Sequence, residues 1–148
     1  MSPAAKTPRL LFLCTGNSCR SQMAEGWARA LLGDRVEVHS AGTVARGLDP
    51  RAVQVMREMG VDISQQTSKT LESLGDLTFE LVVTVCADAD RNCPHFPGPT
   101  RKLHKGFDDP PRLASGAASE ADALRHYRRV RDEIREFVAS LRDVLRTY

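Results

Sequence analysis

The sequence lacks the segments that mark secreted and membrane-spanning proteins. Residues 1–8 contain no apolar stretch of the kind that forms a signal peptide. The apolar run Leu10–Leu13 is far shorter than the roughly 20 residues of a transmembrane helix. We therefore expect no membrane association and, by default, a cytoplasmic protein.

Net charge and aromatic residues are also scarce. The formal net charge of the 148-residue chain is only +2, and aromatic residues make up 5% of it. So small a charge does not favour binding to nucleic acid, and any positive potential that matters must be local to a site. No internal repeat or linker divides the sequence. We expect one monomeric domain over residues 1–148, with residues 1–8 as a flexible tail.

Apolar periodicity predicts strands that alternate with helices. Short apolar or alternating runs indicate strands at 10–13, 36–41, 81–85 and 101–107. Apolar residues at helical spacing indicate helices at 20–32, 50–59, 68–74 and from 120 onward. Two helical faces are expected to be buried, one formed by Val53, Met56 and Met59, and one by Leu124, Tyr127, Val130, Ile134, Phe137, Leu141 and Val144. This order predicts an α/β three-layer sandwich around a four-stranded parallel sheet.

The segment 14–21 lies between the first predicted strand and the first predicted helix. It begins with Cys14, and Arg20 follows six residues later. Backbone N–H groups and a helix N-terminus bind anions, and an arginine can contact two oxygens at once. The segment therefore predicts a nucleophilic cysteine above a cradle for a tetrahedral oxyanion, formed by Thr15, Gly16, Asn17, Ser18, Cys19, Arg20 and Ser21. The same positive field should hold Cys14 as a thiolate.

Three reactive groups follow three different predicted strands. Cys14 follows the first, Cys86 the third, and Asp108–Asp109 the fourth. Ligands of parallel sheets bind beyond the carboxyl ends of the strands, so we expect these groups to form one composite site. The four cysteines have spacings that do not match common zinc sites, so no metal is expected. Cys19 is expected to be a packing residue.

The residues quoted above resemble a known family. Cys14-x-Gly16-Asn17-x-Cys19-Arg20-Ser21, with Asp109-Pro110 downstream, resembles the low-molecular-weight protein tyrosine phosphatases. Three longer segments resemble more closely the thioredoxin-coupled arsenate reductases of that superfamily: 14–25, 86–94 with its second cysteine pair, and 106–110. The resemblance implies a low-molecular-weight phosphatase-like fold, arsenate as the substrate and thioredoxin as the partner that supplies reducing equivalents.

The resemblance also implies residue roles. Cys14 would attack arsenic, Arg20 would stabilise the developing charge, and Asp109 would protonate the leaving oxygen. Cys86 would then attack the Cys14 sulfur and release arsenite, and Cys93 would attack Cys86 to form the disulfide that thioredoxin reduces. If residues 86–93 were helical, the two ends would be roughly 10 Å apart. A disulfide needs Cα atoms within roughly 7 Å, so we expect this segment to unwind on oxidation.

One position departs from the family. Members of it can bind potassium through residues that match Asn17, Glu25 and Thr67 plus an aspartate, and the position of that aspartate holds Lys69 here. We expect the lysine ammonium to take the place of the cation, so that no cofactor and no potassium is required.

Several alternatives remain open from the sequence. A low-molecular-weight phosphatase is one, although Pro111 and Arg112 stand where such phosphatases typically carry aromatic residues. A thiol redox sensor that binds oxyanions is another. Asp108 competes with Asp109 for the role of acid. The four histidines are interpreted as ordinary strand, loop or helix-surface residues, and Met23 and Trp27 as core. The basic face of the last helix is interpreted as solvated, with thioredoxin docking as the alternative, and carries Arg125, Arg128, Arg129 and Arg131.

Overall fold

A parallel sheet of four strands forms the centre of the structure, a computed structural model that describes residues 7–96 and 98–146. The strands are β1 (Arg9–Cys14), β2 (Glu37–Gly42), β3 (Leu81–Thr84) and β4 (Arg101–His104). Their order in the sheet is β2-β1-β3-β4, and every neighbouring pair is parallel. The predicted four-stranded parallel sheet is therefore confirmed.

The burial of the strands follows their composition. Leu10, Leu11 and Phe12 of β1 are fully buried, and all four residues of β3 are buried. Strands covered on both faces consist of continuous apolar runs, which is the pattern that β1 and β3 show. The edge strand β4 is mostly exposed, in keeping with its charged residues.

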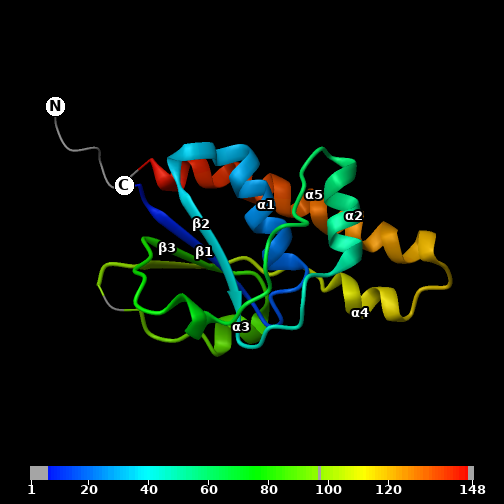
Figure 1. Cartoon of the computed structure of the whole chain (residues 1–148), viewed down its shortest axis with the longest axis horizontal. Coiled ribbons are helices and arrows are strands. Elements are labelled where there is room, and N and C mark those ends of the chain that lie inside the picture. The colour runs from blue at the N-terminus through cyan, green and yellow to red at the C-terminus, as the bar shows by residue number, and fades with distance from the viewer. Residues whose placement is uncertain (1–6, 97, 147–148) are drawn as a thin grey trace.

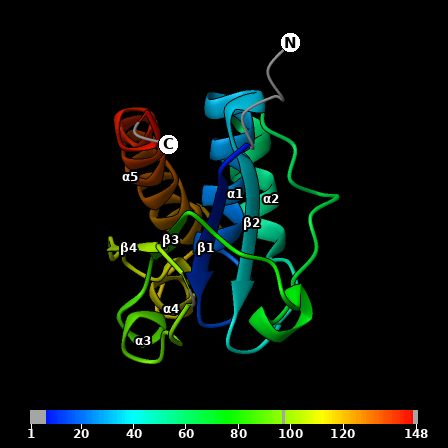
Figure 2. The ribbon, with the colours of Figure 1, turned by 90° about the vertical axis from the view of Figure 1, so that its left-hand side faces the viewer.

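Helices α1 (Arg20–Leu32), α2 (Pro50–Glu58) and α5 (Glu120–Leu145) pack together on one side of the sheet (Figure 1). The other side carries the 3₁₀ turn Leu71–Leu74 and the short helix α3 (Ala87–Arg91), with α3 against β1 and β3 (Figure 2). A second 3₁₀ turn, Gly33–Arg35, follows α1, and helix α4 (Pro110–Ser115) packs on α5. These layers confirm the predicted three-layer α/β sandwich.

The interface between α1 and α5 contains the only tryptophan of the chain. Trp27 is 3% exposed, and its indole Nε1 donates a hydrogen bond to the carbonyl of Arg131 at 3.1 Å. The guanidinium of Arg135 lies 5.4 Å from the centre of the Trp27 ring. Met23 is fully buried on the same helix, so both residues belong to the core, as predicted.

Some sequence-based expectations are wrong in detail. Met59 is 40% exposed because α2 ends at Glu58, and the buried face of that helix is formed by Ala52, Val55 and Met56. The predicted helix over 68–74 is only the 3₁₀ turn, since Thr70 forms a parallel bridge to Gly42 and holds the preceding chain extended.

Two further boundaries differ near the fourth strand. The predicted strand 101–107 ends at His104. Pro110 and Pro111 do not simply stop the chain but begin α4, because proline is well suited to the first turn of a helix. The predicted flexible tail lies outside the described residues apart from Thr7 and Pro8.

The basic face of α5 is only partly solvated. Arg125 and Arg129 are ion-paired at the surface, whereas Arg131 is 7% exposed and donates to the carbonyl of Val55 at 3.0 Å. Arg131 and Arg128 both pair with Glu58, which joins α5 to α2. Within residues 7–96 and 98–146, no helix has the combination of length and apolar character that crossing a membrane requires.

Candidate active site

The loop between β1 and α1 is the floor of the site. Its shape depends on Asn17, the residue with a positive φ (46°), a conformation that asparagine tolerates better than most residues. The fully buried Asn17 side chain donates to Ser21 Oγ at 2.8 Å and to Ser40 Oγ at 3.0 Å. Its Oδ1 accepts from the backbone N–H of Lys69 at 2.9 Å. Asn17 and Ser21 therefore support the loop from behind, while the other predicted residues face the cavity.

The end of β2 lies directly against this loop. A Cβ atom added to Gly42 would lie 2.5 Å from the Val44 carbonyl oxygen, 2.6 Å from that of Thr15 and 2.8 Å from the Asn17 nitrogen. The backbone of the segment after β2 also bonds to the loop, from Val44 N to Thr15 O at 3.1 Å. Only glycine permits so close an approach, so the sheet itself holds the loop in place.

Arg20 projects into the cavity from the first turn of α1. Its Nη1 donates to the Phe107 carbonyl at 3.0 Å, and its Nη2 lies 3.7 Å from Asp109 Oδ1. Its Nε is buried and has no hydrogen-bond partner within the described parts of the chain. A buried charged donor without a partner is costly, so this group favours an anion at the loop.

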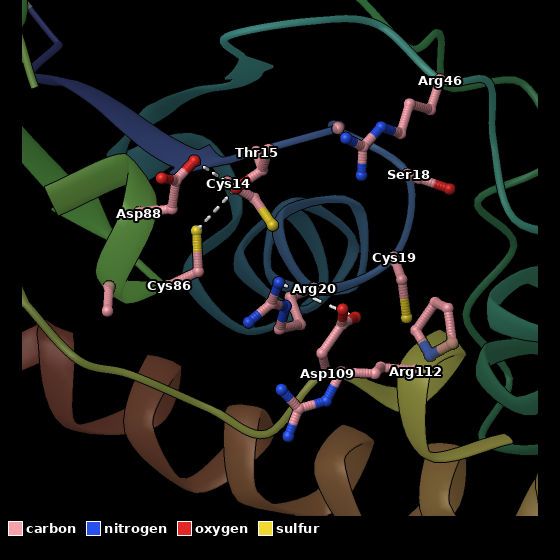
Figure 3. A pocket seen from close by; sticks show the side chains of 13 residues that line it. Cys14, Thr15, Ser18, Cys19, Arg20, Arg46, Cys86, Asp88, Asp109 and Arg112 are labelled. Atoms are coloured by element: carbon pink, nitrogen blue, oxygen red, sulfur yellow. Dashed lines mark hydrogen bonds and ion pairs between the residues drawn. The ribbon is translucent and has the colours of Figure 1, made fainter. Parts of the chain in front are cut away.

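Cys14 and Cys86 both line the cavity and face each other across it (Figure 3). Cys86 caps the N-terminus of α3, where its Sγ accepts the N–H of Ala89 at 3.3 Å. The hydroxyl of Thr15 lies 3.3 Å from Cys86 Sγ and 3.2 Å from Asp88 Oδ2. The Ala89 N–H thus donates to the Cys86 sulfur, and the single proton of the Thr15 hydroxyl lies within hydrogen-bond distance of both that sulfur and Asp88.

The two thiols differ in pKa as a result. The hydrogen bond from Cys14, followed by those from Thr15 and Ala89, lowers the pKa of Cys86 to about 5. The same hydrogen bond to Cys86, followed by burial, raises the pKa of Cys14 above its usual value, although Arg20 opposes the shift. The directions of the two shifts favour the thiolate at Cys86 over the thiolate at Cys14. The pKa of Cys14 is thus raised, the opposite of the direction predicted from the sequence, because the interaction with Cys86 and burial outweigh the effect of Arg20.

The two candidate acids point in different directions. Asp109 lines the cavity beside Arg20, at the residue before α4. Asp108 instead forms an ion pair with Arg129 of α5 at 3.1 Å, and its side chain is 65% exposed. Of the two aspartates, only Asp109 therefore lines the cavity.

Cys93 lies at the opposite end of α3 from Cys86, just after the helix ends. It is half-buried, and burial raises the pKa of its thiol. It does not line the main cavity but a smaller one of about 20 Å³, which it shares with Cys14, Leu71 and Ala89. All four cysteines are free thiols in this structure. Helix α3 therefore lies between Cys86 and Cys93 along the chain, while Cys14 and Cys93 border the same small cavity.

Lys69 extends toward the residues named for a potassium site. Its Nζ donates to the Thr67 carbonyl at 3.0 Å and lies 3.9 Å from Glu25 Oε1. Glu25 is 3% exposed and accepts from Ser40 Oγ at 2.6 Å. Burial lowers the pKa of Lys69, and Glu25 opposes that shift. Asn17, Glu25, Thr67 and Lys69 thus form one connected group behind the loop.

The main cavity has a volume of about 400 Å³. Of the predicted site residues it is lined by Cys14, Thr15, Gly16, Ser18, Cys19, Arg20, Cys86 and Asp109. Five residues that sequence reasoning did not assign to the site also line it, namely Arg46, Ala87, Asp88, Pro111 and Arg112. In the sequence, Arg112 is close to Asp109 and Asp88 is close to Cys86, which was the only indication that they belong to the site. No sequence feature indicated Arg46. None of the histidines lines this cavity.

A strand–loop–helix anion site of this kind places the chain in a known class. The family model of the low molecular weight phosphotyrosine protein phosphatases matches residues 9–147, and the chain belongs to that family. This confirms the resemblance seen in the sequence.

Within this family, the chain has high sequence identity to several proteins that are named arsenate reductases. The chain is 54% identical to the arsenate reductase of Bacillus subtilis (strain 168) over 125 residues, which is 84% of this chain and 88% of that protein. It is 47% identical to arsenate reductase 2 of Staphylococcus epidermidis over 133 residues, or 90% of this chain and 95% of the other. A solved arsenate reductase in the phosphate binding state superposes with a TM-score of 0.71 at 31% identity, covering 90% of this chain and 95% of that one.

Proposed function

We propose that the protein is an arsenate reductase. The observation that carries the proposal is the pair of facing thiols, Cys14 and Cys86, above an anion loop with an unpartnered Arg20 Nε. Hydrolysis of a phosphate ester needs one nucleophilic cysteine, whereas reduction needs a second sulfur that can take over the bond. Relatives named arsenate reductase, with 54% and 47% sequence identity to this chain, support the same conclusion.

The first step is attack by Cys14 on arsenic. The proton of Cys14 passes along its hydrogen bond to Cys86, so that Cys14 becomes the nucleophilic thiolate. Its sulfur bonds to arsenic, and one arsenate oxygen leaves as water after it takes a proton from Asp109. Arg20 and the loop N–H groups stabilise the negative charge on the remaining oxygens.

The second step is the reduction itself. The proton of Cys86 passes to an oxygen of the departing arsenite as the Cys86 thiolate attacks the Cys14 sulfur. The sulfur–arsenic bond breaks, and arsenic leaves with the electron pair as arsenite. Two thiols have then been oxidised to the Cys14–Cys86 disulfide, and arsenic(V) has been reduced to arsenic(III). The donors on Cys86, namely Ala89 N–H and the Thr15 hydroxyl, keep it available as a thiolate.

The third step transfers the disulfide away from the loop. Cys93 attacks Cys86 and frees Cys14, and the Cys86–Cys93 disulfide is reduced by thioredoxin. Because α3 lies between these two cysteines, the helix must unwind for this bond to form. We also propose that thioredoxin is the partner and that the protein acts as a monomer. Its location would be the cytoplasm, where thiols stay reduced.

We further propose that Lys69 replaces a bound cation. Its ammonium contacts the Thr67 carbonyl and approaches Glu25, which in turn bonds Ser40 and, through it, Asn17. A fixed positive charge at this point balances buried Glu25 and steadies the loop. No metal or other cofactor takes part in the proposed reaction.

Phosphatase activity is the second candidate function, favoured by the family and by Asp109 beside the loop. In that reaction water would hydrolyse the cysteinyl phosphate and Cys86 would have no role. A thiol redox sensor is a weaker alternative, since it would not need Asp109.

An anaerobic assay of arsenite production with thioredoxin, thioredoxin reductase and NADPH tests the proposal. We expect many turnovers for the parent and for Cys19→Ser, and none for Cys86→Ser or Cys93→Ser. Sustained arsenite production without Cys86 or Cys93 would contradict the relay. Multiple-turnover hydrolysis of an aryl phosphate, with no arsenate reduction, would establish the phosphatase instead.

A further inference from the structure

Two arginines at the mouth of the main cavity have no role in the reaction described above. Arg46 and Arg112 line the cavity together with Arg20, and both are exposed. Arg20 is engaged by the Phe107 carbonyl and by Asp109. In residues 7–96 and 98–146, by contrast, no ion pair joins Arg46 or Arg112 to a carboxylate. Their charge is therefore available to a ligand.

The two side chains lie on different sides of the opening. Arg46 is attached to the loop, because its backbone N–H donates to the Gly16 carbonyl at 2.9 Å and its Cδ would lie 2.8 Å from a Cβ on Gly16. Arg112 belongs to α4 and lies beside Asp109. Figure 3 shows Cys14 and Arg20 between the two arginines.

The cavity is larger than the proposed substrate. Its volume of about 400 Å³ falls within the range of sites for organic ligands, roughly 300–1,000 Å³. An arsenate or phosphate ion held on the loop would occupy only the floor. The remaining space, between the loop and α4, is bordered by Arg46, Pro111 and Arg112.

The outer part of the cavity is electropositive. The carboxylates that face the cavity are Asp88 and Asp109, and each already has partners. Asp88 accepts from Thr15 and lies 3.7 Å from Arg91, while Asp109 lies 3.7 Å from Arg20. Neither neutralises Arg46 or Arg112, so the field at the mouth favours a second negative group on the ligand.

We propose that Arg46 and Arg112 form an outer anion subsite, which favours oxyanion esters whose organic part has a second negative charge. The oxyanion binds the loop, and the second group, a carboxylate or phosphate, lies toward the arginines. This proposal rests on the proposed function in one respect, namely that an oxyanion binds the loop. It adds a class of ligand, charged organic oxyanion esters, to inorganic arsenate.

Calorimetric titration of the reduced protein with two phosphonates tests the subsite. The probes are 4-carboxyphenylphosphonate and 4-carbamoylphenylphosphonate, which have nearly the same shape but differ by one charge. We expect the carboxylate to bind about fivefold more tightly, the ratio typical of exposed charge pairs. The preference should disappear in the double variant Arg46→Ala/Arg112→Ala. It should persist in Arg57→Ala/Arg125→Ala, which removes the same charge from helices that do not line the cavity.

Each outcome supports or overturns the proposal. Equal affinities in the parent, a preference that survives loss of both arginines, or no binding of either phosphonate would overturn it. The parent alone provides a second measure, since the preference should shrink as the salt concentration rises. Arsenite production by the same preparation separates the two proposals. If arsenite is produced normally but the two phosphonates bind equally, only the proposed subsite is contradicted. If the carboxylate binds more tightly but no arsenite is produced, only the proposed reductase function is contradicted.

Discussion

The hydroxyl of Tyr127 donates a 2.5 Å hydrogen bond to Oδ2 of Asp49. Asp49 is also the N-cap of α2, where its Oδ1 accepts from Arg51 N at 2.9 Å, and its own N–H donates to the Ser18 carbonyl at 3.1 Å. A single residue, Asp49, therefore connects the C-terminal helix and α2 through its carboxylate and the anion loop through its backbone N–H. Tyr127 is 1% exposed, so the connection is protected from water.

Replacing Tyr127 by phenylalanine should weaken the fold and the loop together. The variant keeps the ring but removes the donor to Asp49, so we expect the free energy of unfolding to fall by about 1–2 kcal/mol. We also expect weaker phosphate binding, because Asp49, whose backbone N–H donates to Ser18, is held less firmly without the Tyr127 hydroxyl. Urea denaturation and phosphate titration measure the two effects, and an unchanged phosphate affinity would show that the connection stops at α2.

The same residue predicts a pH effect. Burial, followed by the hydrogen bond to Asp49, raises the pKa of Tyr127 above its ordinary value of 10.0. Above that pH the unfolded chain loses a proton that the folded chain retains, so the free energy of unfolding of the parent should fall as pH rises. Tyr127→Phe should lack this part of the decline. Denaturation curves between about pH 9 and pH 11 test the difference.

Thr15→Val should raise the pKa of Cys86. The substitution keeps the shape of the side chain but removes the hydroxyl 3.3 Å from Cys86 Sγ, one of the groups that lower that pKa to about 5. Site-resolved alkylation with iodoacetamide as a function of pH should show Cys86 reacting at higher pH than in the parent. Thr15→Ser, which keeps a hydroxyl, should behave like the parent; an identical profile for Thr15→Val would exclude the role of the hydroxyl.

Lys69→Asp should create a response to potassium. The variant removes the ammonium near Glu25 and adds an oxygen donor beside the Thr67 carbonyl. Its thermal midpoint should rise with potassium chloride more than with sodium chloride at equal ionic strength, whereas the parent and Lys69→Met should not distinguish the salts. A parent midpoint that rises specifically with potassium would contradict the proposed role of Lys69.

Oxidation to the Cys86–Cys93 disulfide should unwind α3. The helix has only five residues and ends at Arg91, and of these only Ala89 is buried, so its local stability is low. Backbone amide NMR shifts of residues 84–96 should differ between the reduced protein and the oxidised Cys14→Ser variant, while those of β2 stay unchanged. Identical shifts across 84–96 would show that the disulfide forms without unwinding.

Gly42→Ala should be strongly destabilising. The new methyl group would collide with three backbone atoms of the loop and its neighbour, at 2.5–2.8 Å. We expect a loss of about 3 kcal/mol or more in the free energy of unfolding, together with loss of phosphate binding. Gly116→Ala is the matched control, since the nearest atom to its added Cβ is 4.0 Å away. Similar stabilities for the two variants would contradict the tight contact.

The sheet could be predicted from the sequence because its inner strands are continuous apolar runs. Leu10–Leu13 and Leu81–Val85 can be buried on both faces only in a parallel sheet with helices around it. The composite site followed from the same reasoning, since Cys14, Cys86 and Asp109 each come after a strand. Sequence patterns were sufficient to predict the structure wherever the residues of one segment alone determine whether it forms a buried strand.

The features that escaped prediction depend on partners distant in sequence. Met59 has helical spacing, but the helix ends one residue earlier, and Thr70 is held extended by Gly42. The charge on Cys86 depends on donors from β1, the loop and α3 together. Arg46 reaches the cavity only because its backbone N–H bonds to the Gly16 carbonyl, and no sequence pattern predicts such a contact.

The buried position of Trp27 gives the protein a natural optical reporter. Because this is the only tryptophan of the chain and it lies between α1 and α5, its fluorescence originates from a single, apolar environment. Emission should shift to longer wavelength when those helices separate and water reaches the indole. Its signal thus follows the unfolding of the helical layer without any added dye, and opening of α3 on the other side of the sheet should leave it unchanged.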